Sequence, residues 1–141
     1  MTAENSVFTE KEIDYLNSQR LGRLSTIKPD GAPTNVPVGF RYNAESQTID
    51  IGGHRLGDSF KFRNIQRDPR VAFVVDDLAS VSPWTPRGIE IRGTAEAIVG
   101  GGGTGLNPGF SGELIRITPT RIRSWGVEAP AFSAPANTRD V

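Results

Sequence analysis

The segment from Ile89 to Ile98 most constrains the fold of this chain. Its side chains alternate between apolar or small and polar, in the order Ile-Glu-Ile-Arg-Gly-Thr-Ala-Glu-Ala-Ile. Successive side chains of a β-strand point to opposite faces of a sheet, so this alternation predicts a strand with one buried face.

Further short strands are predicted on both sides of this segment, bounded by turn residues. They cover residues 21–27, 34–42, 48–53, 71–75, 114–118 and 121–125. Because Pro33 and Pro37 lack an amide N–H, strand 34–42 must lie at an edge, at a bulge or where a ligand approaches. Asp76 and Asp77 are expected to end strand 71–75, and Pro119 is expected to separate the last two strands.

Only two helices are predicted. Thr9 and Glu12 have the spacing of a capping box, which predicts a helix from about Thr9 to Gln19. A second, basic helix begins near Asp58 or Ser59 and runs directly into strand 71–75. Six or seven short strands with two helices predict a mainly β fold, a mostly antiparallel barrel.

The length predicts a single domain over residues 1–141. Within it we expect an N-terminal extension at 1–7, a Gly-rich loop at 100–112 and a C-terminal tail at 126–141. Ordering the Gly-rich loop would cost conformational entropy, so it is expected to be flexible and to hold no site.

The composition argues against several classes of function. Sixteen basic and 16 acidic side chains give no net charge, which speaks against nucleic acid or an anionic membrane as a partner. The absence of cysteine and the single histidine leave no pattern for a metal site. Since neither a signal peptide nor a run of about 20 apolar residues is found, we expect a cytoplasmic protein.

The basic helix is the first candidate site. Lys61 and Arg63 lie near its start, where free backbone N–H groups favour an anion such as a phosphate. In the alternative interpretation, the basic side chains form a solvated face while Phe60 or Phe62 and Ile65 pack inward.

Two further residues have open interpretations. Trp84 lies in a loop between two prolines, where it either covers a planar ligand or a partner subunit or closes the end of the barrel. No catalytic motif flanks His54, the single histidine. It either takes part in a site or occupies a structural or exposed position.

Three motifs carry a resemblance to a known family. They are Leu21 to Pro33, Lys61-x-x-Asn64-Ile65-x-x-Asp68-Pro69-Arg70-Val71, and Gly88 to Glu96. Over residues 8–125 the chain resembles the pyridoxamine 5'-phosphate oxidase-like split barrels, and among them the short actinobacterial members that use the deazaflavin coenzyme F420. The resemblance implies a six- to seven-stranded antiparallel split β-barrel with two short helices. It also implies a homodimer with the cofactor in a groove between the subunits.

The resemblance also implies a cofactor site. In it Lys61 would bind the cofactor phosphate, Ser59, Arg63 and Asn64 would lie nearby, and residues 36–38 would line the ring system. With Gly53, His54 and Trp84 added, the predicted cofactor-binding residues are Val36, Pro37, Val38, Gly53, His54, Ser59, Lys61, Arg63, Asn64 and Trp84. No catalytic residue and no metal ligand is predicted.

The expected function is that of an F420-dependent oxidoreductase. It would transfer a hydride from reduced F420 to an unsaturated or quinone-like small molecule, with the cofactor supplying the chemistry. The alternatives are an FMN-binding oxidoreductase of the same fold and a non-catalytic protein that binds a flavin, deazaflavin or haem-like ligand. The resemblance also implies that the chain does not oxidise pyridoxamine phosphate itself. Family members with that activity carry an arginine and a histidine for the substrate in a longer C-terminal segment, and here no histidine follows His54.

Overall fold

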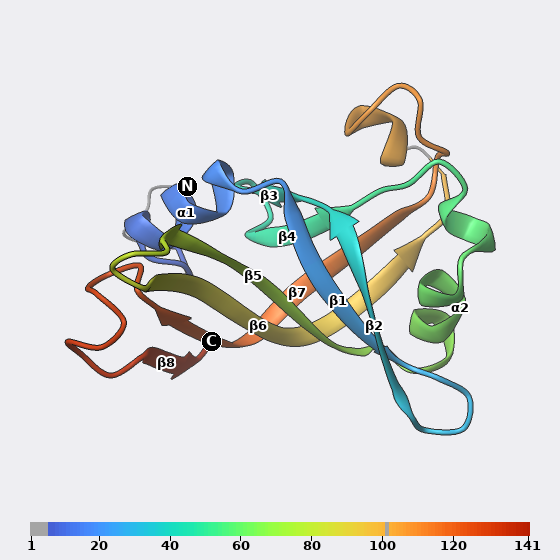
Figure 1. Ribbon diagram of the computed structural model, residues 1–141. Helices are drawn as coiled ribbons and strands as arrows, with labels where there is room; N and C mark the ends of the chain where they lie inside the picture. The colour runs from blue at the N-terminus through green and yellow to red at the C-terminus, as the bar shows by residue number, and fades with distance from the viewer. Residues whose placement is uncertain (1–5, 101) are drawn as a thin grey trace.

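One curled antiparallel sheet forms most of the molecule, and an α-helix lies at each of its two ends (Figure 1). This computed structural model describes residues 6–100 and 102–141. The elements are α1 (Glu10–Ser18), β1 (Leu21–Ile27), β2 (Pro33–Gly39), β3 (Arg41–Asn43), β4 (Thr48–Ile51), the short 3-10 helix η2 (Leu56–Asp58), α2 (Phe60–Arg67), β5 (Arg70–Ser80), β6 (Thr85–Ile98), the 3-10 helix η3 (Gly103–Gly105), β7 (Leu114–Trp125) and β8 (Asn137–Asp140).

The strands follow the order β2-β1-β5-β6-β7-β4-β3, and β8 is added to β7. The apolar residues of these strands meet inside the curl and form the core. Those without any exposed surface are Leu24, Ile49, Ile51, Phe73, Val75, Ile89, Ile91, Ile115, Ile117 and Ile122. The predicted mainly β fold with two α-helices is confirmed. No helix among the described residues is long and apolar enough to span a membrane.

β6 is paired along nearly its whole length, with β5 on one side and β7 on the other. As the alternation predicts, Ile89, Ile91 and Ala95 are buried. Gly93 faces Pro119 where the register shifts, and a Cβ atom on Gly93 would lie 2.1 Å from the Thr118 carbonyl oxygen. Pro119 therefore lies at a bulge within one long strand, and the prediction of two separate strands was wrong.

β5 continues to Ser80, so the prediction that Asp76 and Asp77 end the strand was also wrong. Each carboxylate is neutralised across the sheet, Asp76 by Arg23 at 3.1 Å and Asp77 by Arg87 at 2.6 Å. Cross-strand pairs of opposite charge stabilise a sheet, which is why the two aspartates are compatible with a strand.

Both helices begin as their sequences predict. Thr9 and Glu12 form a capping box at α1, and Ser59 caps α2. Phe62 and Ile65 of α2 are buried, whereas Phe60 is 80% exposed. This result decides between the two phenylalanines that the sequence left open.

Three segments outside the predicted strands have more structure than expected or are only partly described. The predicted tail at 126–141 contains β8, and the predicted Gly-rich loop contains η3. Residues 1–5 of the predicted N-terminal extension, and residue 101 of the loop, lie outside the described part of the chain.

β2 is an edge strand, which agrees with Pro33 and Pro37.

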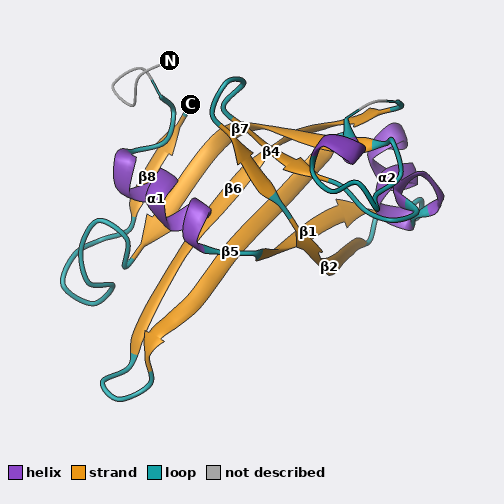
Figure 2. Cartoon of the chain, turned by 90° about the horizontal axis from the view of Figure 1, so that it is seen from above, coloured by secondary structure: helices purple, strands orange, loops and turns teal. Residues whose placement is uncertain are grey.

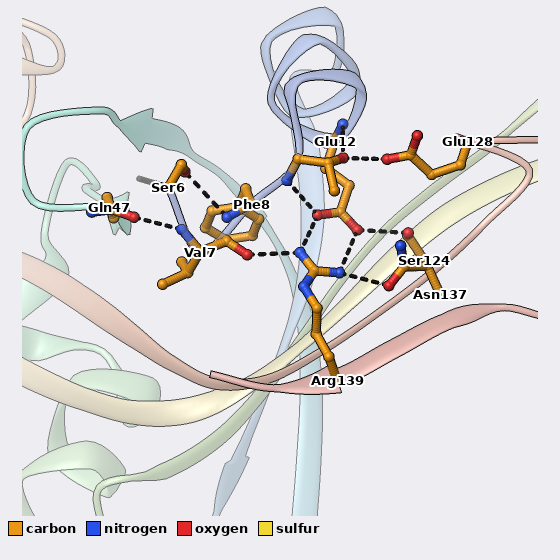
Figure 3. Close-up of polar contacts among 10 residues, drawn as sticks. Ser6, Val7, Phe8, Glu12, Gln47, Ser124, Glu128, Asn137 and Arg139 are labelled. Atoms are coloured by element: carbon orange, nitrogen blue, oxygen red, sulfur yellow. Dashed lines mark hydrogen bonds and ion pairs between the residues drawn. The ribbon is translucent and has the colours of Figure 1, made fainter. Parts of the chain in front are cut away.

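A buried ion pair joins the C-terminal strand to α1 (Figure 3). The Glu12 side chain has no exposed surface, and Arg139 donates to its two oxygens at 2.5 and 3.1 Å. Ser124 donates to the same carboxylate at 2.6 Å, and Arg139 also donates to the Val7 carbonyl oxygen at 2.7 Å. Burial alone would raise the pKa of Glu12, but the hydrogen bonds from Arg139 and Ser124 outweigh it and hold this pKa below its ordinary value.

We predict that Arg139→Met destabilises the fold by about 3–5 kcal/mol, because it leaves a buried carboxylate without its counter-ion. Urea unfolding at neutral pH measures this loss. The matched control is Arg121→Met. Arg121 on β7 pairs with the exposed Asp140, which is the neighbour of Arg139 on β8, so its loss should cost at most about 1 kcal/mol. Equal losses in the two variants would contradict the importance of the Glu12 pair.

We also predict that stability falls with acidification. Glu12 and Asp50 are both buried, and hydrogen bonds from Arg139 and Arg116, respectively, lower their pKa values despite burial. A group whose pKa is lowered by folding contributes stability above its unfolded pKa, and this contribution is lost as the pH falls through the folded pKa. The free energy of unfolding should therefore decrease between about pH 5 and pH 2.

Urea unfolding across this pH range tests the prediction. The double variant Glu12→Gln/Arg139→Met, in which one of the two carboxylates is absent, should lose less stability on acidification than the wild type. An equal loss in both proteins would contradict the assignment to Glu12.

Candidate functional site

α2 is held on β1 by polar contacts of Asn64 and Arg67. Asn64 is buried and donates to the Thr26 hydroxyl on β1 at 3.0 Å. Arg67 donates to the Asn64 side-chain oxygen at 3.4 Å and also to the Ile27 carbonyl oxygen. Asn64 thus positions the helix. One side of the helix lines a groove.

This groove lies between α2 and the turn that joins β1 to β2, and its volume is about 450 Å³. We call it the α2 groove; its lining residues are Lys28, Pro29, Thr34, Phe60, Arg63, Asn64 and Arg67. Three of them carry a positive charge and none carries a negative one. The donor set therefore suits a ligand with several anionic oxygens.

Lys61 occupies the first turn of α2 and is half-buried. Burial lowers its pKa, and the structure records no hydrogen bond or ion pair of its ammonium group among the described residues. The first turn of α2 also carries no acidic side chain. A partly dehydrated cation beside free backbone N–H groups is a favourable place for an anion.

Lys61 does not line the α2 groove. Residues two positions apart in a helix are separated by about 200°, so Lys61 and Arg63 project from opposite sides of α2. A single phosphate cannot be held by both. A ligand that reaches both must pass over the first turn, beside Phe60.

Ser59 has a structural task. Its hydroxyl donates to the Leu56 carbonyl oxygen at 2.6 Å and accepts from the Phe62 amide at 3.3 Å. Of the cofactor-binding residues predicted on and beside α2, the structure thus brings Arg63 and Asn64 into the groove, leaves Lys61 on the other face, and uses Ser59 as a cap.

The predicted ring-lining residues lie on the edge strand β2. Val36 is half-buried and Pro37 is exposed, but Val38 is buried in the core. Val36 and Pro37 are consecutive in the strand and point to opposite faces of it. Either one, but not both, can therefore offer its side chain to the same face of a ring system, whereas the Val38 side chain is used by the core.

Gly53 and His54 contact the Gly-rich loop. The Gly53 carbonyl oxygen accepts from the amide and the hydroxyl of Ser111, at 2.9 and 3.0 Å. The Nδ1 atom of His54 lies 2.9 Å from the Gly109 carbonyl oxygen, and its ring packs edge-to-face on Phe110. The loop predicted to be flexible is thus attached to the segment that leads into α2.

Trp84 lies far from the other predicted residues. It is 59% exposed at the tip of the hairpin between β5 and β6. Figure 2 shows this tip and α2 on opposite sides of the molecule. One subunit therefore does not bring Trp84 to the α2 groove.

Five residues of the α2 groove were missed from the sequence. Phe60 and Arg67 could have been found, because positions 60, 63 and 67 share one face of a helix. Lys28, Pro29 and Thr34 reach the groove only through the pairing of β1 with β2, which no local pattern reveals.

Comparisons with known proteins agree with this fold. Residues 8–102 match the model of the family described as pyridoxamine 5'-phosphate oxidase. The 5a,11a-dehydrotetracycline/5a,11a-dehydrooxytetracycline reductase of Streptomyces rimosus is 46% identical over 134 residues, which are 95% of this chain and 93% of the relative. The predicted class, an oxidoreductase, is confirmed by this relative.

Two solved structures from mycobacteria are also similar. The conserved hypothetical protein Rv2991 of Mycobacterium tuberculosis has a TM-score of 0.63 and 26% identity, over 92% of this chain and 94% of its own. The FAD binding protein of Mycobacterium smegmatis has a TM-score of 0.60 and 18% identity, over 96% and 99%, and shows the fold alone. The curled sheet is thus the split barrel that the sequence motifs predict, and the chain belongs to the pyridoxamine 5'-phosphate oxidase family.

Proposed function

We propose that the protein is a homodimeric, F420-dependent reductase that transfers a hydride to an unsaturated, quinone-like small molecule. The observation that carries the proposal is the group of cations on α2 and around its groove, because neither the helix nor the lining of the groove contains an acidic residue. Lys61 lies half-buried in the first turn, and the α2 groove presents Lys28, Arg63 and Arg67.

The residues around α2 fit a phosphorylated cofactor. The helix start supplies free N–H groups, and Lys61 supplies a cation whose charge burial has made costly. A phosphate bound there would relieve that cost. Val36 or Pro37, which point to opposite faces of the edge strand β2, would contact the ring system.

The α2 groove favours F420 over FMN. FMN carries its charge on one phosphate, which Lys61 can bind alone. F420 carries in addition a tail of carboxylates, and these would use the three cations on the other face of the helix. FMN remains the alternative cofactor, and the second test below separates the two.

The reduced deazaflavin supplies a hydride when bound, and solvent supplies the proton that completes the reduction of the acceptor. The chain itself binds and orients the two reactants. The name of the Streptomyces relative describes reduction of a dehydrogenated polycyclic compound, which supports an acceptor of this class here.

A second copy of the chain would complete the site. Trp84 is separated from α2 within one subunit, so it can cover a cofactor at α2 only if a partner subunit presents it. This arrangement agrees with a cofactor groove between two subunits.

We predict that Lys61→Ala weakens F420 binding by about 10- to 100-fold, the value of one charge-assisted hydrogen bond of about 1.5–3 kcal/mol. Fluorescence titration of the purified protein measures the affinity. The midpoint of urea unfolding should change little, because the Lys61 ammonium has no recorded partner among the described residues. Lys11→Ala, on the exposed face of α1, is the control. Unchanged F420 affinity in a folded Lys61→Ala variant would exclude the phosphate role.

The double variant Lys28→Gln/Arg63→Gln tests which cofactor the protein uses. It should weaken F420 binding by at least about tenfold and leave FMN binding nearly unchanged, because only F420 would reach the α2 groove. Parallel titrations with both cofactors give the comparison. Preferential binding of FMN by the wild type, with equal effects of the double variant on both ligands, would favour the FMN alternative. Consumption of reduced F420 on addition of a quinone then tests the reaction itself.

A further inference from the structure

A second hollow lies at the other end of β2, where the chain passes into β3. Its volume is about 360 Å³, and the junction of α1 with β1 and the Gly-rich loop form its sides. We call it the β2–β3 hollow; the side chains that the argument uses are Arg20, Phe40, Arg41, Leu106, Asn107 and Phe110.

The charge of this hollow is not neutralised. Arg20 and Arg41 are exposed, and no hydrogen bond or ion pair of either guanidinium is recorded within residues 6–100 and 102–141. No acidic residue lines the hollow. A guanidinium offers a planar set of donors that matches a carboxylate, an enolate or a phenolate.

Aromatic rings form the apolar part of the hollow. Phe40 and Phe110 are both half-buried, and each is held edge-to-face by another ring, Phe40 by Phe73 at 5.3 Å and Phe110 by His54 at 5.1 Å. Gly52 makes the close approach of Phe110 possible, because a Cβ atom there would lie 2.6 Å from that ring. The free faces of such rings suit a flat, apolar ligand.

The wall formed by the Gly-rich loop is fastened in place. Ser111 bonds to Gly53 through its amide and its hydroxyl, and it accepts from the Leu56 amide at 3.1 Å. His54 adds its contact with the Gly109 carbonyl oxygen. In Figure 1 this loop, drawn in orange, stands beside the segment that leads into α2. Because the wall is already fixed, binding of a ligand does not have to order the loop, and this lowers the entropy cost of binding.

We propose that the β2–β3 hollow binds the acceptor substrate, a planar, largely apolar molecule that carries an anionic oxygen group. Arg20 and Arg41 bind the anionic oxygens, and Phe40 and Phe110 contact the rings. Phe40 follows Val38 after a single residue, so this ligand lies next to the segment proposed to line the cofactor ring. The term acceptor rests on the proposed function, whereas binding of the ligand does not.

Two flat probes that differ in charge test the hollow. Anthraquinone-2-carboxylate and its neutral carboxamide are titrated by calorimetry into the protein without cofactor. The wild type should bind the carboxylate at least about tenfold more tightly than the carboxamide, and Arg20→Gln/Arg41→Gln should abolish this preference. Arg92→Gln, which removes an exposed arginine on β6, should keep it.

Two results would overturn the proposal. One is equal affinity of the wild type for both probes, or affinity for neither. The other is a carboxylate preference that survives in the double variant. Phe110→Ala, checked for folding by circular dichroism, should weaken both probes to the same degree, and unchanged affinities would exclude the aromatic contact.

The same variants separate this proposal from the proposed function. Arg20→Gln/Arg41→Gln should bind F420 as the wild type does, because both residues lie outside the α2 groove. In turnover with anthraquinone-2-carboxylate and reduced F420, the double variant should raise KM about tenfold with little change in kcat. An unchanged KM would exclude the acceptor role. If the wild type did not bind F420 but kept its preference for the carboxylate, the proposed cofactor would be wrong and the ligand site in the β2–β3 hollow would stand.

Discussion

The pairing of β6 with both β5 and β7 is the constraint on which the rest of the structure depends. It buries Ile89 and Ile91 on one face and curls the sheet around them. The curl is tight at Gly93, where the neighbouring backbone leaves no room for a side chain. Because the inside of the curl is filled by the core, the α2 groove and the β2–β3 hollow lie outside it, at the two ends of the edge strand β2. α2 lies on one side of the molecule, and the hairpin with Trp84 lies on the opposite side.

The elements predicted correctly are those whose signals are local. The capping box of Thr9 and Glu12 and the alternation of β6 depend on neighbours within a few residues. The errors arose where a distant partner overrides a local signal, as when Arg23 and Arg87 keep Asp76 and Asp77 within a strand. β8 has a short polar sequence with no strand pattern of its own. It is secured by contacts such as that of Arg139 with Glu12, 127 residues away in the chain.

The candidate site was partly predictable for the same reason. A basic helix with a serine cap is visible in the sequence, but its division into two faces, with Lys61 on one and Arg63 on the other, requires helix geometry. The β1–β2 turn brings Lys28 to the groove, and only tertiary structure shows this. His54 stays a predicted cofactor-binding residue. Its Nδ1 atom contacts the Gly109 carbonyl oxygen, 55 residues later, and this contact helps to fix the loop.

A net charge of zero argues against binding a polyanion over a large surface, yet it says nothing about how the charges are distributed. Here several acids are engaged by arginines within the sheet, as in the pairs of Asp50 with Arg116 and Asp77 with Arg87. The cations of the two hollows have no such partners among their lining residues. Thr34 lines one hollow and Gly39 the other, at a spacing of roughly 16 Å along β2. In the proposed arrangement, an extended anionic cofactor bound at α2 would direct its ring along β2 toward an acceptor at the far end of the same edge strand.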